Sequence, residues 1–74
     1  MSDNYFEWRG NVIKTWGDLA NAARSCVTKE DAESFLKAYK EVDEVYAEKN
    51  LHYIFGYYGS EERNRLNTLF FSKW

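Results

Sequence analysis

The sequence lacks most of the features that usually reinforce a very small domain. It has one cysteine, Cys26, one histidine, His52, and no proline in 74 residues. A single cysteine excludes an internal disulfide, and one Cys with one His cannot supply the four ligands of a structural zinc site. A chain of this length buries only about 60–65% of the surface that its unfolded form exposes. Its stability must therefore come from a dense apolar core or from a partner.

Strong charge and long apolar runs are also missing. The net charge is −2 and the pI is about 5.3, so the chain has no basic field that would attract nucleic acid. No apolar run approaches the ~20 residues of a membrane span. The first residues, MSDNYFEW, lack the basic and apolar regions of a signal peptide. These absences predict a cytoplasmic protein that does not associate with membranes and keeps its single thiol reduced.

The residue patterns of enzymes are absent as well. The sequence pairs no nucleophile with a base, clusters no metal ligands and has no glycine-rich phosphate loop. Cys26 is in phase with an apolar helix face, which indicates a small buried residue. His52 has only Glu48 in helical phase as an acidic neighbour and is interpreted as a partly exposed structural residue. We therefore predict no enzymatic activity, no catalytic residues, no cofactor and no metal.

What the chain has in abundance is aromatic side chains: three Trp, six Tyr and five Phe. Large rings bury much area per residue, so some of them are expected to replace the missing disulfides and metal. Tyrosine also tolerates water at its hydroxyl end and is enriched at protein interfaces. The surplus of tyrosine would therefore suit binding of another protein or formation of a homodimer.

Apolar spacing predicts an all-α fold, a single domain over 1–74 with three to four helices. Thr15 with Asp18 resembles a helix cap, and the helix that it begins should end near Ser25 or Cys26. Thr28, followed by Glu30 and Asp31, begins a second helix. The core is predicted to comprise Trp16, Leu19, Ala23, Phe35, Leu36, Tyr39, Leu51, Ile54, Phe55, Leu66 and Leu69.

The second half requires a helix break near Val42 and Asp43. A straight helix through this point would bury polar residues, because the apolar stripes before and after it differ in phase. Asp43 is therefore predicted to cap a new helix over 44–58. Gly59 suits the left-handed position that often follows a helix, and Ser60 begins a last helix. Gly56, inside the predicted helix, suggests another backbone passing close by.

Residues 1–14 leave two alternatives open. The aromatic spacing fits a short helical turn that ends at Gly10, whereas Gly10-Asn11 between YFEW and VIKTW fits the turn of a β-hairpin. In either form, the aromatic residues of this segment are expected to pack on the helices.

Two stretches resemble small uncharacterised helical proteins of phages and mobile elements. The first fits the pattern T-x-E-E-A-x-x-F and the second fits Y-A-x-x-N-I-G-Y-x-x-G-Y, over about half of the chain. His52 stands where that pattern usually has glycine, and Glu44 where it often has proline. The resemblance implies a source and a helical fold but no activity. The matching positions are Thr28, Glu30, Asp31, Ala32, Phe35, Tyr46, Ala47, Asn50, Leu51, Tyr53, Gly56 and Tyr57.

The candidate binding residues are Tyr46, Asn50, Tyr53 and Tyr57. Their spacings of four, three and four place them on one face of the predicted helix, beside the core stripe. In one interpretation the tyrosines cover the edge of the core and Asn50 bonds a neighbouring helix end. In the other they form a contact patch for a partner protein.

The function predicted on this basis is that of a non-enzymatic protein-interaction module, encoded by a phage or mobile element, that modulates a host or phage protein. The alternative is a nucleic-acid-binding regulator of the helix-turn-helix kind. Acidic Glu61 and Glu62 at the start of the last helix make nucleic acid an unlikely partner. The side chains that would face DNA in the alternative are Arg63, Asn64, Arg65, Asn67 and Lys73.

Overall fold

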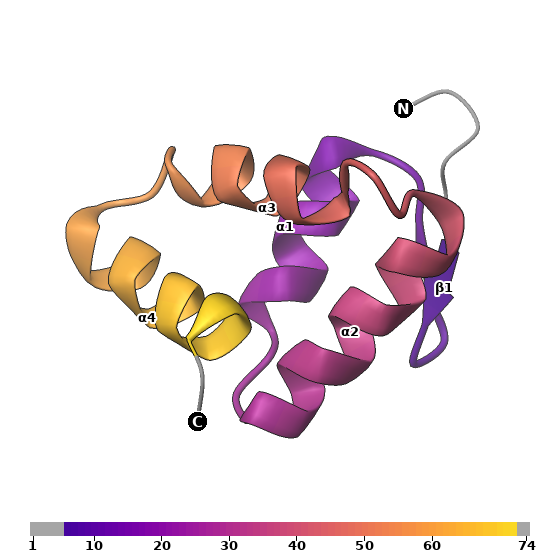
Figure 1. Cartoon of the computed structure of the whole chain (residues 1–74), viewed down its shortest axis with the longest axis horizontal. Helices are drawn as coiled ribbons and strands as arrows, with labels where there is room; N and C mark the ends of the chain where they lie inside the picture. Colours follow the sequence, from indigo (N-terminus) through magenta and orange to yellow (C-terminus); the bar gives the residue numbers. More distant parts are fainter. Residues whose placement is uncertain (1–5, 73–74) are drawn as a thin grey trace.

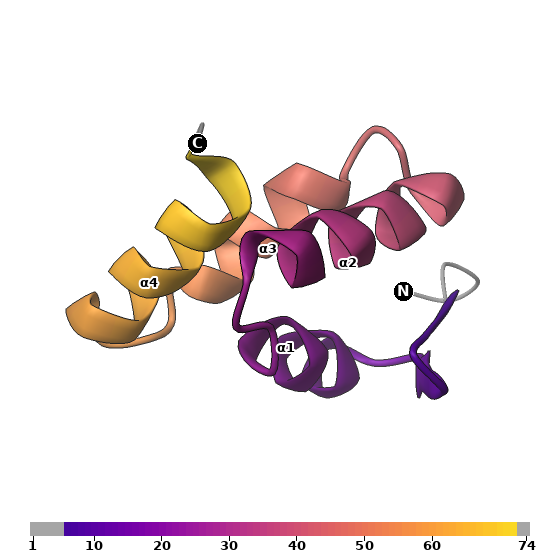
Figure 2. The same ribbon diagram turned by 90° about the horizontal axis from the view of Figure 1, so that it is seen from below.

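A computed structural model describes residues 6–72, and within them a β-hairpin precedes four α-helices (Figure 1). The prediction of a small, mainly helical fold is confirmed, but the class is not strictly all-α, because residues 6–13 pair as strands. The hairpin lies beside α2, at the end of the molecule opposite α4, and α1 lies beneath α2 and α3 (Figures 1 and 2). The elements are β1 Phe6–Trp8, β2 Asn11–Ile13, α1 Trp16–Arg24, α2 Lys29–Val42, α3 Ala47–Phe55 and α4 Ser60–Phe71.

The hairpin, one of the two alternatives for the N-terminal segment, is the form adopted. Its antiparallel register pairs Phe6 with Ile13 and Trp8 with Asn11. The two residues between the strands, Arg9 and Gly10, have φ values of 52° and 80°, both in the left-handed region that a type I′ turn needs. The turn is therefore Arg9-Gly10, one residue earlier than the expected Gly10-Asn11. Strand alternation buries Phe6 and Trp8 against α2.

Both predicted helix starts are complete capping boxes. The Thr15 and Thr28 hydroxyls each accept a hydrogen bond from the backbone N–H three residues later, at Asp18 and Asp31. Each aspartate carboxylate bonds in return to the backbone N–H of its threonine, at 3.3 and 3.1 Å. These local bonds explain why two helix starts were readable from the sequence. The first helix ends at Arg24, one or two residues before its predicted end.

The predicted helix break is also present, but the helix after it is shorter than predicted. α2 ends at Val42, and the Asp43 side chain accepts a hydrogen bond from the Tyr46 N–H at 3.2 Å. α3 then covers Ala47–Phe55 instead of 44–58. The residues before it form a turn, which carries the chain from the end of α2 into the new direction of α3.

Two glycine predictions are wrong. Gly59 has φ of −61° and is the N-cap of α4, so it does not occupy the left-handed position. Gly56 lies at the exposed C-terminal end of α3, and a Cβ added there would meet only the carbonyl oxygens of Tyr53 and His52, in the preceding turn of its own helix. No other backbone approaches Gly56 among the residues that the structure describes.

The core is centred on Phe35 of α2, whose side chain is fully buried. Rings from the hairpin, α2 and α4 surround it: Trp8 at 5.2 Å, Phe6 at 5.6 Å, Phe70 at 5.8 Å and Tyr39 at 6.4 Å between centroids. Such edge-to-face ring contacts add to the stabilisation from buried area. The predicted core did not include Phe6, Trp8 or Phe70, but the expectation that the N-terminal aromatic residues pack on the helices is confirmed for Phe6 and Trp8.

Most of the predicted core is nevertheless confirmed, because nine of its eleven residues are buried: Leu19, Ala23, Phe35, Tyr39, Leu51, Ile54, Phe55, Leu66 and Leu69. The two exceptions are Trp16, which is 41% exposed, and Leu36, which is partly buried at the edge of the core. Trp16 is the first residue of α1 and lies at the rim of the domain. Cys26 is fully buried as predicted, and this burial raises the pKa of its thiol to about 11.

Two carboxylates connect parts of the chain that are distant in sequence. Asp31 accepts hydrogen bonds from the N–H groups of Val27 and Thr28 and pairs with Arg9 of the hairpin turn at 2.6 Å. Together these contacts lower the pKa of Asp31 to about 2. Glu62 of α4 pairs with Arg65 at 2.9 Å and with Arg24 of α1 at 3.2 Å, and its pKa is also about 2.

We therefore expect acid destabilisation in a defined pH window. Both carboxylates have folded-state pKa values below their ordinary values of 3.8 and 4.5, so each stabilises the fold above about pH 4.5. The stabilisation is lost as the pH falls from about 4.5 to about 2. Thermal unfolding followed by circular dichroism should show the melting temperature falling across this range.

A matched pair of variants tests whether Glu62 causes this fall of the melting temperature with pH. Glu62→Gln should melt lower than the parent at pH 7 and should show a shallower decline below pH 4.5. Glu61→Gln changes the neighbouring acid, which forms no ion pair within residues 6–72, and should keep the parental slope. A parental melting temperature that stays constant down to pH 2.5 would contradict the assignment.

Candidate functional site

The four predicted binding residues lie on and around α3 but do not form one continuous face. Tyr46 is the N-cap of α3, Asn50 and Tyr53 lie within it, and Tyr57 follows two residues after its end. The three tyrosines are 53%, 62% and 72% exposed in that order. Their contacts divide the set into a structural residue, an isolated ring and a coupled pair.

Asn50 is the structural residue. Its side-chain amide donates a hydrogen bond to the Tyr39 hydroxyl at 2.8 Å, across the contact between α3 and α2. Tyr39 is fully buried, and burial raises the pKa of its phenol despite this hydrogen bond. Asn50 thus satisfies a polar group inside the core, where an unpaired hydroxyl would be costly. It bonds a buried side chain instead of a helix end.

Tyr46 is the isolated ring. The Lys49 ammonium lies 5.9 Å from its ring centroid, and within residues 6–72 its ring makes no stacking contact with the other tyrosines. It is therefore separate from the surface that Tyr53 and Tyr57 form.

Tyr53 and Tyr57 form the coupled pair. Their hydroxyls are 2.7 Å apart and hydrogen-bonded, and their rings meet edge to face at 5.3 Å. The hydrogen bond raises the pKa of Tyr57. The Trp16 ring of α1 approaches Tyr53 at 6.2 Å. Two mostly exposed rings are thus held in place by each other and by a third.

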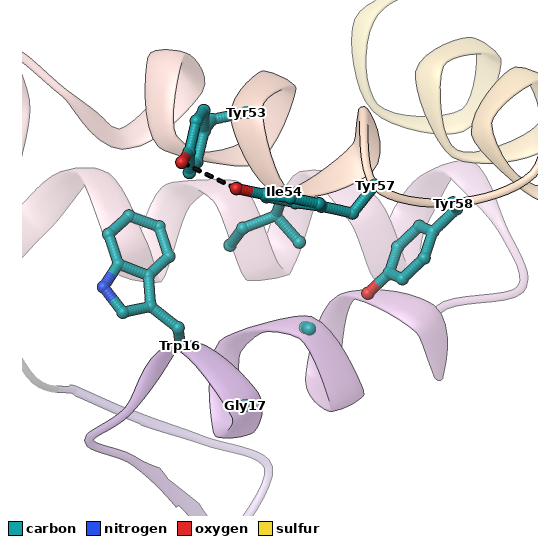
Figure 3. Close-up of a pocket in the computed structure, with 7 residues that line it drawn as sticks. Trp16, Gly17, Tyr53, Ile54, Tyr57 and Tyr58 are labelled. Carbon is teal, nitrogen blue, oxygen red and sulfur yellow. Dashed lines mark hydrogen bonds between the residues drawn. The ribbon is translucent and has the colours of Figure 1, made fainter.

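These rings line a groove between α1 and the end of α3, which we call the aromatic groove; Trp16 comes from α1 and the two tyrosines from the opposite side (Figure 3). Its volume is about 490 Å³. Gly17 and Ala20 of α1 contribute no large side chain, which leaves the space open. The groove is lined by Trp16, Gly17, Ala20, Tyr53, Ile54, Tyr57 and Tyr58.

None of the residues that line the aromatic groove carries a formal charge. At one end, the Arg24 guanidinium lies 5.0 Å from the centroid of the Tyr58 ring, and partial burial raises the pKa of the Tyr58 phenol. The polar groups of the lining are therefore the tyrosine hydroxyls and the backbone. Such a surface suits an uncharged apolar ligand with hydrogen-bonding groups.

The sequence predicts Trp16 to be a core residue, because it is in phase with Leu19 and Ala23, whereas it is 41% exposed and lines the groove. Tyr58 is the last residue of the helix predicted over 44–58, and it lines the groove from beyond the end of α3. The sequence contains one signal that could have indicated the groove. Gly17 and Ala20 are small residues three apart on α1, and they mark a helix face with little side-chain volume.

His52 does not belong to the aromatic groove. It is exposed, and its ring stacks on Phe71 of α4 with 3.9 Å between centroids. Within residues 6–72, no group of three or more His, Cys, Asp or Glu side chains is arranged to hold a metal ion.

The α4 side chains that would face DNA in the alternative are partly engaged within the protein. Arg65 donates hydrogen bonds to the carbonyl oxygens of Cys26 and Arg24, at 3.0 and 3.1 Å, in addition to its pairing with Glu62. These contacts fix Arg65 against the end of α1. Lys73 lies outside the described residues.

Two further findings bear on the class of protein. Among residues 6–72, every helix is too short or too polar to cross a lipid bilayer. Comparison of the chain with protein-family models, with curated proteins and with solved structures gives no match.

Proposed function

We propose that this chain is a non-enzymatic, cytoplasmic interaction protein that binds another protein through the aromatic groove and modulates it. The observation that carries the proposal is the Tyr53–Tyr57 pair, with rings 62% and 72% exposed yet held by a 2.7 Å hydrogen bond. Rings that are already fixed lose little conformational freedom on binding, and Tyr and Trp are the residues that most often dominate interface energetics.

A phage or mobile-element source is part of this proposal. It is supported by the resemblance of residues 28–35 and 46–57 to small proteins of that origin. Within the second stretch, the pattern includes both Tyr53 and Tyr57.

The experiment is a pulldown from host-cell lysate with the immobilised parent and three variants. Tyr53→Ala/Tyr57→Ala should lose at least nine-tenths of any specific partner, because truncating two central rings typically weakens binding by more than tenfold. Tyr46→Ala removes an exposed ring outside the groove and should retain the partner. Asn50→Ala tests whether Asn50 is structural, since loss of its hydrogen bond to Tyr39 should lower the melting temperature.

Circular dichroism establishes that the double variant is folded, as expected from the exposure of both rings. Equal recovery of the partner by the parent and by the folded double variant would refute a binding role for the groove.

A further inference from the structure

The aromatic groove offers ring faces and hydrogen-bond donors, without charge. In the hydroxyl pair of Tyr53 and Tyr57, one hydroxyl donates to the other, and the accepting hydroxyl keeps its own hydrogen for a ligand. In Figure 3 the Trp16 indole nitrogen lies on the ring edge turned away from the tyrosines, so Trp16 offers the groove an apolar ring surface. The groove therefore suits an uncharged ligand with apolar surface and hydrogen-bond acceptors.

A proline-rich segment has this chemistry. Proline has no backbone N–H, its ring is apolar, and the polyproline II helix leaves its carbonyl oxygens free to accept hydrogen bonds. The conformation is largely formed before binding, so docking on an aromatic-lined groove costs little further ordering.

The spacing of the rings agrees with this ligand. Successive centroids from Trp16 to Tyr53 and on to Tyr57 lie 6.2 and 5.3 Å apart. Two residues of polyproline II advance by about 6 Å, so neighbouring rings of this series are about two ligand residues apart. In Figure 3 these rings stand above α1 with Tyr58 beyond them, at the far end of the groove.

The exposed area of the groove rings is by itself too small for the interface of a stable dimer. The accessible parts of Trp16, Tyr53 and Tyr57 together amount to roughly 350 Å², given about 200 Å² for a whole aromatic side chain. A stable dimer buries about 800 Å² on each partner. The chain also has no proline of its own, so a second copy cannot supply the segment.

The charges argue against a cationic ligand. Aromatic cages bind quaternary ammonium groups through ring faces. Here Arg24 already lies over the Tyr58 ring, and the lining residues include no carboxylate that would offset a second positive charge.

We propose that the aromatic groove binds a proline-rich segment of the partner protein in the polyproline II conformation. This inference rests on the proposed function and names the chemistry of the partner. Trp16, Tyr53 and Tyr57 contact the proline rings, and the free tyrosine hydroxyl donates a hydrogen bond to a ligand carbonyl oxygen.

The test is a titration of the ¹⁵N-labelled full chain with a blocked ten-residue proline peptide, followed by NMR. Saturable shifts of the Trp16 indole resonance and of the Gly17 and Ala20 amides are expected. A Gly-Ser peptide of equal length should produce none. Tyr57→Ala should weaken binding at least tenfold, and Tyr57→Phe severalfold, whereas Tyr46→Ala should bind as the parent does.

Three results would overturn the inference. The first is the absence of groove shifts at millimolar proline peptide. The second is an equal loss of peptide affinity in Tyr46→Ala and Tyr57→Ala. The third is a groove that binds tetramethylammonium instead of the peptide, or that a second copy of the chain occupies in a dimer detected by light scattering. If the lysate pulldown still depends on Tyr53 and Tyr57 in such a case, the protein-binding function stands and only the proline chemistry fails.

Discussion

Phe35→Ala is expected to lower the free energy of unfolding by about 3–5 kcal/mol, enough to leave the protein largely unfolded at room temperature. Phe35 is fully buried and makes ring contacts with both the hairpin and α4, so its removal opens a cavity where three segments meet. A core of this size rarely supplies more than ~3–5 kcal/mol in total. The loss therefore equals most of the stability of the domain.

Urea and thermal unfolding followed by circular dichroism measure this effect, and Leu36→Ala is the matched control. Leu36 follows Phe35 on α2 and was predicted from the sequence to be equally buried, but it is only partly buried. Its truncation should cost about 1 kcal/mol, because less apolar area is lost. Equal losses of unfolding free energy in Phe35→Ala and Leu36→Ala would show that the core is not centred on Phe35.

The parts of the fold that the sequence predicts are those encoded by neighbours along the chain. The capping boxes at Thr15 and Thr28 each depend on a residue three positions away, and the break at Asp43 follows from a change of helical phase. The sequence does not decide between the hairpin and a helical turn, because the aromatic spacing also fits a helix and a left-handed arginine at position 9 is not a common turn signal.

The end of α3 was misjudged for a specific reason. Tyr58 is in phase with Leu51 and Phe55, so the predicted helix was extended to include it. After Phe55 the chain instead makes bonds of the i to i+3 kind, from Tyr57 N–H to the Ile54 carbonyl and from Tyr58 N–H to the Phe55 carbonyl. These tighter turns keep Tyr58 against the core although the α-helix has ended.

The candidate site was predictable only in part. Tyr53 and Tyr57 were identified from their spacing, but spacing alone did not separate them from Asn50, whose partner Tyr39 is on another helix. Trp16 completes the ring series through a contact between α1 and α3 that spans nearly forty residues of sequence. Tertiary contacts of this kind leave no periodic signal in the chain.

Trp8→Ala is expected to cost about 3–5 kcal/mol, comparable to the loss at Phe35. A two-stranded hairpin is marginally stable on its own, so this one depends on what it packs against. Trp8 is 6% exposed, meets Phe35 edge to face at 5.2 Å and donates an indole hydrogen bond to the Ser34 hydroxyl at 3.1 Å. The Arg9 guanidinium covers the ring at 4.7 Å.

Hydrogen exchange shows whether Trp8 stabilises the whole domain or only the hairpin. In Trp8→Ala, amide protection should fall in α2 and α4 as well as in the strands, because the Trp8 ring packs on Phe35, which in turn contacts α4 through Phe70. Ser34→Ala removes only the hydrogen bond to the indole and should cost about 1 kcal/mol, with α4 still protected. If Trp8→Ala lowers the free energy of unfolding no more than Ser34→Ala does, the hairpin does not stabilise the core, and the helices form it without the strands. If protection is lost throughout, the two short strands are as necessary to the domain as its helices, which explains how so small a chain folds without an internal disulfide.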